Sequence, residues 1–361
     1  LQNIILTAQK PLILIGAKPS TWNQQANDNI QKFVENHKLP VATVFRRQDQ
    51  FDNNHPNYVG VKGVGTDPKL EAFVDQADAL IIIGAEMTDI ETNGYRKYDI
   101  PHPRQKLVHV SSGHEDIGRV FQADLSIVCD MTEFAKAASE LEPNDQHPWE
   151  GWVKQGHKNY QEFSLDKGNM QDADLAGVMK WLDETLPDDT IVSFGAGNYT
   201  QWVQRYFSHN QFGTQLATQS AVMGYSVPAA ISASMLHQER TILSFAGDGC
   251  FLMNGQEIAT AVRYNTNVKF IVINNSRYGS IQMHQEKRFP ERSIAVDLTN
   301  PDFAALARAY GMPAMQVHTI DDFIKSFIEL NKTDGPCLIE ILTDPNVITP
   351  SIMLSDLRKG S

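Results

Sequence analysis

The sequence predicts an α/β protein with two domains, and three observations support this prediction. Short apolar runs of strand length, such as residues 11–16 and 79–84, lack the polar alternation of a half-exposed strand. Segments with apolar residues at helical spacing separate these runs. The pattern occurs twice, before and after a polar stretch at residues 143–170. Continuous apolar strands between helices are typical of parallel sheets, so we expect two Rossmann-like domains, each a mostly parallel sheet with helices on both faces.

Composition narrows the class of protein. The 361 residues carry a net charge of −12, with 42% apolar and 20% charged residues. This charge argues against nucleic acid and anionic membranes as partners. The longest apolar runs, such as residues 79–83, are far shorter than a membrane span. Cys129, Cys250 and Cys337 are far apart and form no CxxC motif, so a reducing, cytoplasmic location is expected.

The first domain is expected to span residues 1–142. Its apolar runs predict five strands, and its amphipathic segments predict two helices. A loop through His55 and Pro56 is expected before the second helix. The strands are predicted at residues 11–16, 41–45, 79–84, 107–111 and 125–129, and the helices at 23–37 and 69–75.

A linker with one helical stretch is predicted for residues 143–170, a polar segment with prolines at positions 143 and 148. Trp149, Trp152, Tyr160 and Phe163 recur there at roughly helical spacing. We interpret them as packing anchors, because aromatic residues at this spacing usually pack against a core.

The second domain is expected to span residues 171–350, followed by a C-terminal tail at 351–361. Amphipathic and apolar patterns again predict alternating helices and strands. Helices are predicted at residues 175–186, 255–264, 303–310 and 321–330, and strands at 190–194, 241–246, 268–273, 314–317 and 337–342.

The most informative stretch is residues 241–281, where a strand, Gly-Asp-Gly, a helix, a second strand and an Asn-Asn pair follow one another. Strands joined in this way lie side by side and parallel. Asp248 and Asn275 then lie at the carboxyl ends of adjacent strands, where open α/β sheets bind ligands. With a turn carbonyl near Arg277 they form a set of oxygen ligands that suits Mg²⁺. Gly-Asp-Gly alone is typical of a β-turn, but the asparagine pair favours the metal site.

A second phosphate-binding pattern occurs at residues 195–197, where Gly-Ala-Gly follows a predicted strand. The third glycine of the dinucleotide fingerprint is missing, because Thr200 occupies its position. This motif suggests an alternative, an oxidoreductase that binds NAD or FAD and needs an acidic residue about 20 positions later. Residues 215–219 offer none. A non-catalytic cofactor-binding module is the other alternative.

The Gly-Asp-Gly and Asn-Asn motifs resemble the signature of enzymes that depend on thiamine diphosphate. The resemblance to acetolactate synthase-like members covers nearly the whole chain, and it implies that Asp248, Asn275 and the carbonyl of Arg277 hold the Mg²⁺ that anchors the diphosphate. It also implies that Met223 bends the cofactor from below, and that the backbone of Ala221 and Met223 binds its aminopyrimidine ring. The cofactor-binding residues implied by the resemblance are Asn198, Tyr199, Ala221, Met223, Gly247, Asp248, Gly249, Cys250, Asn275, Tyr278, Gly279, Ser280 and Ile281.

The resemblance implies decarboxylation of a 2-keto acid, carboligation, or both. Ser280 and His284 are implied as substrate-pocket residues, with His284 in the place of a tryptophan that helps acetolactate synthases select their second 2-keto acid. The activating glutamate of the family lies on a separate pyrimidine-binding domain, which we do not find in this sequence. We therefore assign no catalytic residue to this chain and expect it to be inactive alone. Sites of this family form between subunits, which implies a homodimer or homotetramer.

The first domain resembles the central domain of the same family, where some members bind FAD or ADP. Gly84, Ala85 and Glu86 lie where FAD-binding members carry a longer motif, but the match ends after two residues. We therefore expect this domain to be structural, with FAD as the less favoured alternative.

Overall fold

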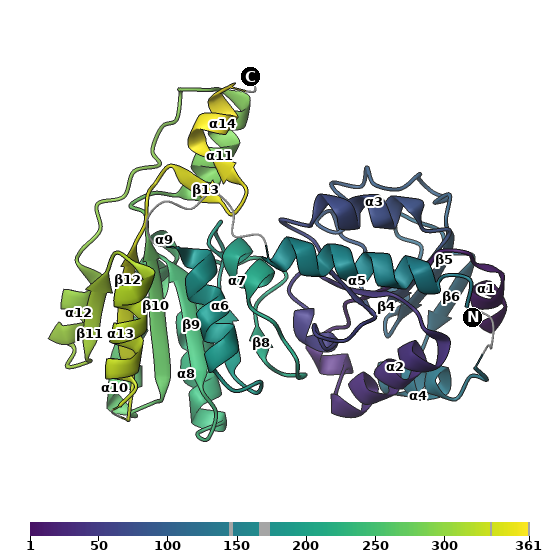
Figure 1. Ribbon diagram of the computed structural model, residues 1–361, viewed down its shortest axis with the longest axis horizontal. Coiled ribbons are helices and arrows are strands. Elements are labelled where there is room, and N and C mark those ends of the chain that lie inside the picture. The colour runs from purple at the N-terminus through teal and green to yellow at the C-terminus, as the bar shows by residue number, and fades with distance from the viewer. Residues whose placement is uncertain (144–146, 166–173, 333, 360–361) are drawn as a thin grey trace. The chain divides into compact units, whose positions relative to one another are not determined.

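The computed structural model describes residues 1–143, 147–165, 174–332 and 334–359. The chain divides into two compact units (Figure 1). Unit 1 comprises Leu1–Leu165 and Ser208–Gly213, and unit 2 comprises Asp166–Phe207 and Thr214–Ser361. The helical stretch expected in the linker is α5 (Glu150–Leu165), which belongs to unit 1. Residues 144–146 and 166–170 of the predicted linker lie outside the described residues.

Unit 1 contains a six-stranded sheet in which all neighbouring strands are parallel, in the order β3-β2-β1-β4-β5-β6. Five of these strands confirm the predicted apolar runs. The sequence analysis missed β3, because Gly60 interrupts its short apolar run and weakens the strand pattern. Pairing with β2 and burial of Tyr58 stabilise this strand. The strands are β1 (Pro11–Ile15), β2 (Val41–Val44), β3 (Tyr58–Lys62), β4 (Ala79–Ile83), β5 (Lys106–Ser111) and β6 (Leu125–Val128).

Side-chain caps begin the main helices of unit 1. Asn23 accepts a hydrogen bond from the Ala26 N–H at the start of α2, and Asp130 accepts one from the Thr132 N–H at the start of α4. The two helices predicted in this unit are confirmed as α2 and α3. The helices are α1 (Gln2–Thr7), α2 (Gln24–His37), α3 (Pro68–Gln76), α4 (Met131–Ser139) and α5, with 3-10 turns η1 (Pro19–Thr21), η2 (Gln48–Gln50) and η3 (His114–Asp116).

Alternate residues of the strands in unit 1 enter different buried clusters. Ile13 and Ile15 of β1 pack in a cluster with residues of α2 and α4. Leu12 and Leu14 pack in a second cluster with residues of α3. Because successive side chains of a strand point to opposite faces, the sheet is covered by helices on both faces, as its continuous apolar strands predicted.

Helix α5 packs against the edge strand β3. Trp149, just before the helix, is buried in the first cluster, and its Nε1 donates a hydrogen bond of 2.9 Å to the carbonyl of Lys38. The ring of Trp152 stacks on Phe73, with ring centroids 3.4 Å apart. These tryptophans are packing anchors, as predicted from their spacing.

Unit 2 contains a second six-stranded parallel sheet, in the order β11-β12-β10-β9-β7-β8. Together the two sheets and their helices confirm the predicted fold class (Figure 1). Strands β9 and β10 are parallel neighbours, as predicted. The strand order reverses at β7, which lies between β8 and β9, and such a reversal marks the usual ligand crevice of open α/β sheets. The strands are β7 (Ile191–Phe194), β8 (Gln215–Leu216), β9 (Ile242–Gly247), β10 (Val268–Asn274), β11 (Ala314–Val317) and β12 (Cys337–Leu342).

The helix between β9 and β10 begins earlier than the sequence predicted. α9 (Asp248–Asn254) starts at Asp248, and a 3-10 turn η4 (Gly255–Glu257) separates it from α10 (Ile258–Arg263). Gly249 serves close packing here, since a Cβ at this position would lie 2.6 Å from a ring carbon of Tyr278. The remaining helices of unit 2 are α6 (Leu175–Thr185), α7 (Thr200–Tyr206), α8 (Ser226–Leu236), α11 (Gly279–Arg288), α12 (Phe303–Ala309), α13 (Ile320–Leu330) and α14 (Leu354–Lys359).

No helix in the described part of the chain has both the length and the apolar character needed to cross a membrane.

The C-terminal segment folds onto α11 (Figure 1). Strands β13 (Val347–Thr349) and β14 (Ile352–Met353) form an antiparallel hairpin that leads into α14. Met283 of α11 forms a small buried cluster with Ile348 and Leu354. Most of the predicted tail at residues 351–361 is therefore ordered structure that covers one side of α11.

A buried carboxylate joins α14 to α11. Glu286 has no exposed side-chain surface, and its Oε1 accepts a hydrogen bond of 2.9 Å from Arg358 Nη2. The hydroxyl of Ser293 and the N–H of Glu291 also donate to this carboxylate, each at 2.7 Å. Arg358 and these donors lower the pKa of Glu286 to about 2, although its burial acts in the opposite direction.

We expect the stabilising effect of this carboxylate to disappear in acid. The folded-state pKa of about 2 lies below the ordinary value of 4.5, so the stabilisation is complete above about pH 5 and is lost as the pH falls towards 2. The difference in unfolding free energy between wild type and Glu286→Gln should therefore shrink over this range in denaturant titrations. Glu329→Gln, which breaks an exposed pair with Lys332, is the matched control and should show little difference at any pH. A difference for Glu286→Gln that does not change with pH would contradict the argument.

Candidate functional site

The carboxyl ends of β7, β9 and β10 open into a cavity of about 370 Å³ in unit 2. This volume lies within the usual range for small-molecule sites, about 300–1,000 Å³. The cavity lies at the strand-order reversal described above. Its lining residues are Ala196, Gly197, Asn198, Tyr199, Ala221, Met223, Gly247, Asp248, Gly249, Cys250, Ile273, Asn275, Arg277, Tyr278, Gly279, Ser280 and Ile281.

The structure brings every predicted cofactor-binding residue to this one cavity, together with Arg277. Ser280 also lines it, whereas His284 does not, because it lies exposed on α11. The sequence analysis did not assign Ala196, Gly197 or Ile273 to the site. The Gly-Ala-Gly motif pointed to the first two, but Ile273 carried no signal beyond its place at the end of a strand.

Asp248 lies at the end of β9 and is almost completely buried, with 3% of its surface exposed. Its Oδ1 accepts a hydrogen bond of 2.8 Å from the Gly249 N–H, and its Oδ2 accepts one of 2.8 Å from Asn300 Nδ2. Burial raises the pKa of this carboxyl above its usual value, although these donors act in the opposite direction. Among the described residues, no basic side chain forms an ion pair with it. A buried carboxylate of this kind can be compensated by a bound cation.

The turn after β10 carries the other two predicted metal ligands. Asn275 Oδ1 accepts a hydrogen bond of 3.1 Å from the Arg277 N–H, and Ser276 between them has a positive φ of 55°. The Arg277 side chain pairs with Asp297 at 3.2 Å, so its carbonyl and not its guanidinium is the candidate ligand. Carboxylate, amide and carbonyl oxygens form the hard ligand set that Mg²⁺ prefers, so these residues fit that cation.

The first turn of α11 presents backbone donors to the cavity. Gly279, Ser280 and Ile281 begin this ten-residue helix and line the cavity, although the Gly279 N–H already donates to the carbonyl of Arg277 at 2.9 Å. N–H groups in the first turn of a helix have no partners within the helix, and the helix dipole favours negative charge there. Ser280 Oγ also donates a hydrogen bond of 2.8 Å to Asn198 Oδ1, which ties α11 to the loop after β7. This end of the cavity can therefore hold an anion.

Tyr199 forms part of the cavity wall but directs its hydroxyl into the protein. The hydroxyl accepts a hydrogen bond of 2.9 Å from the Gly195 N–H and donates one of 3.3 Å to the carbonyl of Phe245. Its ring lies close to Gly247, where a Cβ would be 3.0 Å from a ring carbon. Tyr199 therefore offers its ring, and not its hydroxyl, to a ligand.

The turn that carries Ala221 and Met223 is held against α9. The Gly224 N–H donates to Cys250 Sγ at 3.1 Å, and Asn254 Nδ2 donates to the carbonyl of Gly224 at 3.1 Å. Ala221 and Gly224 both have positive φ values, 52° and 83°. Met223 is half-buried between this turn and the core of unit 2, so its side chain is a fixed apolar surface in the cavity.

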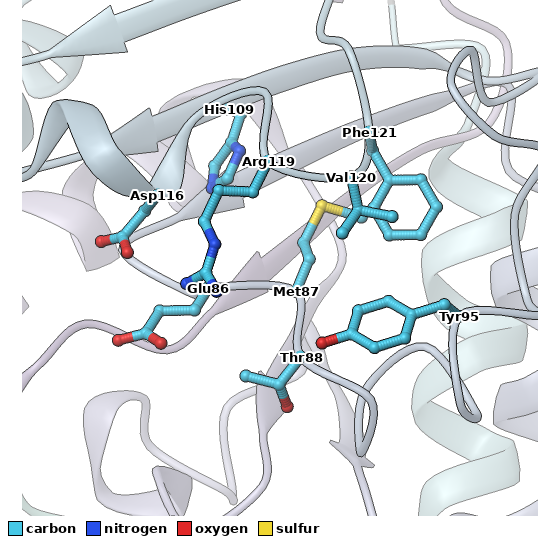
Figure 2. A pocket seen from close by; sticks show the side chains of 9 residues that line it. All are labelled: Glu86, Met87, Thr88, Tyr95, His109, Asp116, Arg119, Val120 and Phe121. Carbon is cyan, nitrogen blue, oxygen red and sulfur yellow. The ribbon is translucent and has the colours of Figure 1, made fainter.

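Among the described residues, unit 1 has a much smaller cavity of about 40 Å³ at the carboxyl ends of β4 and β5. Figure 2 shows polar side chains, including Glu86, Asp116 and Arg119, on one side of it and apolar ones on the other. Lys18 forms ion pairs with Glu86 at 2.9 Å and with Asp116 at 3.3 Å beside this cavity. Such a volume accommodates a few water molecules but not a nucleotide.

The fold and the large cavity define an α/β protein with a ligand site at a strand-order reversal, and comparison with known proteins identifies the family. The C-terminal TPP binding domain of the thiamine pyrophosphate enzymes matches residues 195–341, and their central domain matches residues 1–138. Thiamine pyrophosphate (TPP) is the same compound as thiamine diphosphate. The chain therefore belongs to the thiamine pyrophosphate enzyme family.

Several acetolactate synthases are similar to this chain along most of its length. The large subunit of acetolactate synthase isozyme 2 from Escherichia coli K12 is 25% identical over 345 residues, which cover 95% of this chain and 61% of that protein. The large subunit from Parasynechococcus marenigrum is 26% identical, covering 94% of this chain and 55% of that protein. The mitochondrial catalytic subunit from Saccharomyces cerevisiae is 25% identical, covering 96% of this chain and 52% of that protein. This chain thus spans roughly half to three-fifths of the length of these relatives.

Close packing around Cys250 makes Gly195 intolerant of a side chain. A Cβ at Gly195 would lie 2.5 Å from Cys250 Sγ and 3.3 Å from the carbonyl of Val222. Gly195→Ala should therefore lower the unfolding free energy by about 1–3 kcal/mol in denaturant titrations. Cys250→Ala should recover part of this loss, because it removes the closest atom. Gly151→Ala, where a Cβ meets nothing within 4 Å, is the control. Additive effects of Gly195→Ala and Cys250→Ala would show that this contact is unimportant.

Proposed function

We propose that this chain supplies the diphosphate- and Mg²⁺-binding part of a thiamine diphosphate-dependent enzyme that acts on 2-keto acids by decarboxylation, carboligation or both. One observation carries the proposal. A single cavity at the strand-order reversal gathers a buried carboxylate, an amide oxygen, a turn carbonyl and the first turn of α11. The acetolactate synthases among the relatives support the substrate class.

In this proposal the Mg²⁺ ligands are the carboxylate of Asp248, the side-chain oxygen of Asn275 and the carbonyl of Arg277. These oxygens would hold the cation beside the first turn of α11, whose backbone N–H groups would donate hydrogen bonds to the diphosphate. When bound, thiamine diphosphate supplies the nucleophilic carbon and the electron sink for reactions at a 2-keto acid carbonyl. The side chain of Met223 and the ring of Tyr278 provide apolar contacts for the cofactor rings.

We expect a surface of another domain to cover the cavity and complete the cofactor site. Val222 and Ile281 beside the cavity are each about half exposed, at 49% and 48%, and Leu252 and Met253 of the neighbouring α9 are exposed at 43% and 46%. Such apolar side chains around a cavity support the prediction that a pyrimidine-binding domain covers it in a homodimer or homotetramer. The activating glutamate is predicted on that domain, so we assign no catalytic residue here and expect residues 1–361 to be inactive alone.

A reducing, cytoplasmic setting also stays a prediction, consistent with three free cysteines.

Thermal unfolding with added ligands tests the cofactor assignment. Thiamine diphosphate with Mg²⁺, each at about 100 times its Kd, should raise the Tm by about 5–10 °C, and neither should do so alone. Asp248→Ala should abolish this shift, because the carboxylate of Asp248 is the charged group among the three proposed protein ligands of Mg²⁺. Glu239→Ala, at an exposed carboxylate that does not line the cavity, should behave as wild type. Stabilisation by NAD in place of thiamine diphosphate would favour the oxidoreductase alternative.

Substitutions on α11 separate cofactor binding from substrate selection. Ser280→Ala removes the hydrogen bond to Asn198 and should weaken cofactor binding about five- to tenfold in calorimetric titrations. His284→Ala should leave cofactor affinity unchanged, because His284 does not line the cavity. In the complete enzyme, His284→Ala should instead change the KM for 2-keto acids, because the family resemblance implies that His284 belongs to the substrate pocket. A loss of cofactor affinity in His284→Ala would contradict this division, and no turnover of pyruvate would exclude an acetolactate synthase.

A further inference from the structure

Asn300 lies in the segment between α11 and α12 and ties the ends of two strands together. Its Nδ2 donates one hydrogen bond of 2.8 Å to Asp248 Oδ2, at the end of β9. It donates a second of 2.8 Å to Asn274 Oδ1, at the end of β10. A side-chain amide has two N–H donors, so both are used. One side chain thus connects the predicted metal-binding carboxylate to the strand that precedes the second predicted ligand.

The surrounding hydrogen bonds determine the orientation of the Asn300 amide. Asn274 Nδ2 donates to Glu340 Oε1 at 2.7 Å, and the Ser276 N–H donates to Asn274 Oδ1 at 3.0 Å. The group that Asn274 turns towards Asn300 is therefore its oxygen, an acceptor. Asp248 also offers only acceptors when ionised. Asn300 must consequently direct its nitrogen at both partners, and its Oδ1 is buried with no hydrogen-bond partner among the described residues.

A buried glutamate anchors this arrangement to the rest of the sheet. Glu340 in the middle of β12 is completely buried. Besides Asn274, it accepts hydrogen bonds from Gln316 Nε2 at 3.0 Å and from the Ala304 N–H at 3.2 Å. The network therefore extends across four neighbouring strands, from β11 through β12 and β10 to β9. Apart from Asn300 Oδ1, the polar side-chain atoms named in this network have hydrogen-bond partners, which leaves these side chains little freedom to move.

These contacts leave the Asp248 carboxylate with a defined orientation. The Gly249 N–H holds one oxygen and Asn300 holds the other, each at 2.8 Å. The nearby N–H groups of Ser276 and Arg277 also favour the ionised form of this carboxylate. Without Asn300, the carboxylate would lose its side-chain donor among the described residues, and with it part of what fixes its rotation about its side-chain bonds.

We propose that Asn300 is a positioning residue that orients the Asp248 carboxylate for a divalent cation. The inference rests on the proposed function, since it takes Asp248 as a metal ligand. The contribution of Asn300 in this proposal is to hold the Asp248 carboxylate and to link it to Asn274 at the end of β10. Removing a group that orients a metal ligand typically weakens metal affinity 10- to 100-fold.

Direct metal titration of the full chain tests this inference. Mn²⁺ replaces Mg²⁺ as the probe, because its electron paramagnetic resonance signal reports free and bound ion in the presence of thiamine diphosphate. Asn300→Ala should raise the Kd for Mn²⁺ 10- to 100-fold and alter the spectrum of the bound ion. Excess Mn²⁺ should restore the wild-type affinity for thiamine diphosphate. Asn331→Ala, at an exposed asparagine of the same unit, is the matched control and should bind as wild type.

Two comparisons distinguish the outcomes. If Asp248→Ala binds Mn²⁺ as tightly as wild type, the proposed metal site itself is wrong. If Asp248→Ala loses the metal while Asn300→Ala keeps wild-type affinity and spectrum, Asn300 has only a structural role and this inference alone is overturned. Should Asn300→Ala not fold, Asn300→Leu keeps a similar volume and removes both donors without adding a charge, and the same expectation and the same overturning result apply to it.

Discussion

The candidate site of unit 2 is built around a carboxylate that is almost completely buried at the edge of the cavity. Asp248 is 3% exposed, and N–H groups but no described basic side chain surround it. Burying an uncompensated charge is unfavourable, so a fold that keeps one at the end of a strand favours a bound cation. The turn after β10, the first turn of α11 and the segment with Asn300 all converge on this position. In the proposed function, this arrangement orients the carboxylate for a cation.

The two units share an architecture but differ at the carboxyl ends of their strands. In unit 2 the strand-order reversal opens into a cavity of about 370 Å³, whereas the cavity described at the carboxyl ends of β4 and β5 in unit 1 has about 40 Å³. Lys18, paired with Glu86 and Asp116, lies beside the smaller cavity. A parallel sheet therefore provides only the place for a ligand site, and the side chains at the strand ends decide whether space remains there.

Helix α11 connects the stability of the C-terminal segment to the cavity. Its first turn lines the cavity, while Glu286 in its last turns is held by Arg358 of α14. Ser280 at the start of the helix also bonds to Asn198 after β7. Both ends of the helix are thus fixed by side chains from distant parts of the chain, which keeps its first turn in position beside the cavity.

The sequence by itself determined the fold class and the parallel pairing of β9 and β10, which follow from the apolar periodicity and from the motifs at strand ends. The resemblance to a known family, carried by the Gly-Asp-Gly and Asn-Asn motifs, implied most of the residues around the cavity, but not Ala196, Gly197 or Ile273. The sequence did not reveal β3, whose glycine weakens the local pattern, nor the helix that begins at Asp248. Only the tertiary structure showed that Tyr199 turns its hydroxyl inward, that His284 is exposed and that Asn300, 52 residues from Asp248, bonds to it. Such contacts depend on where the chain returns to the sheet, and no local pattern of residues encodes that position.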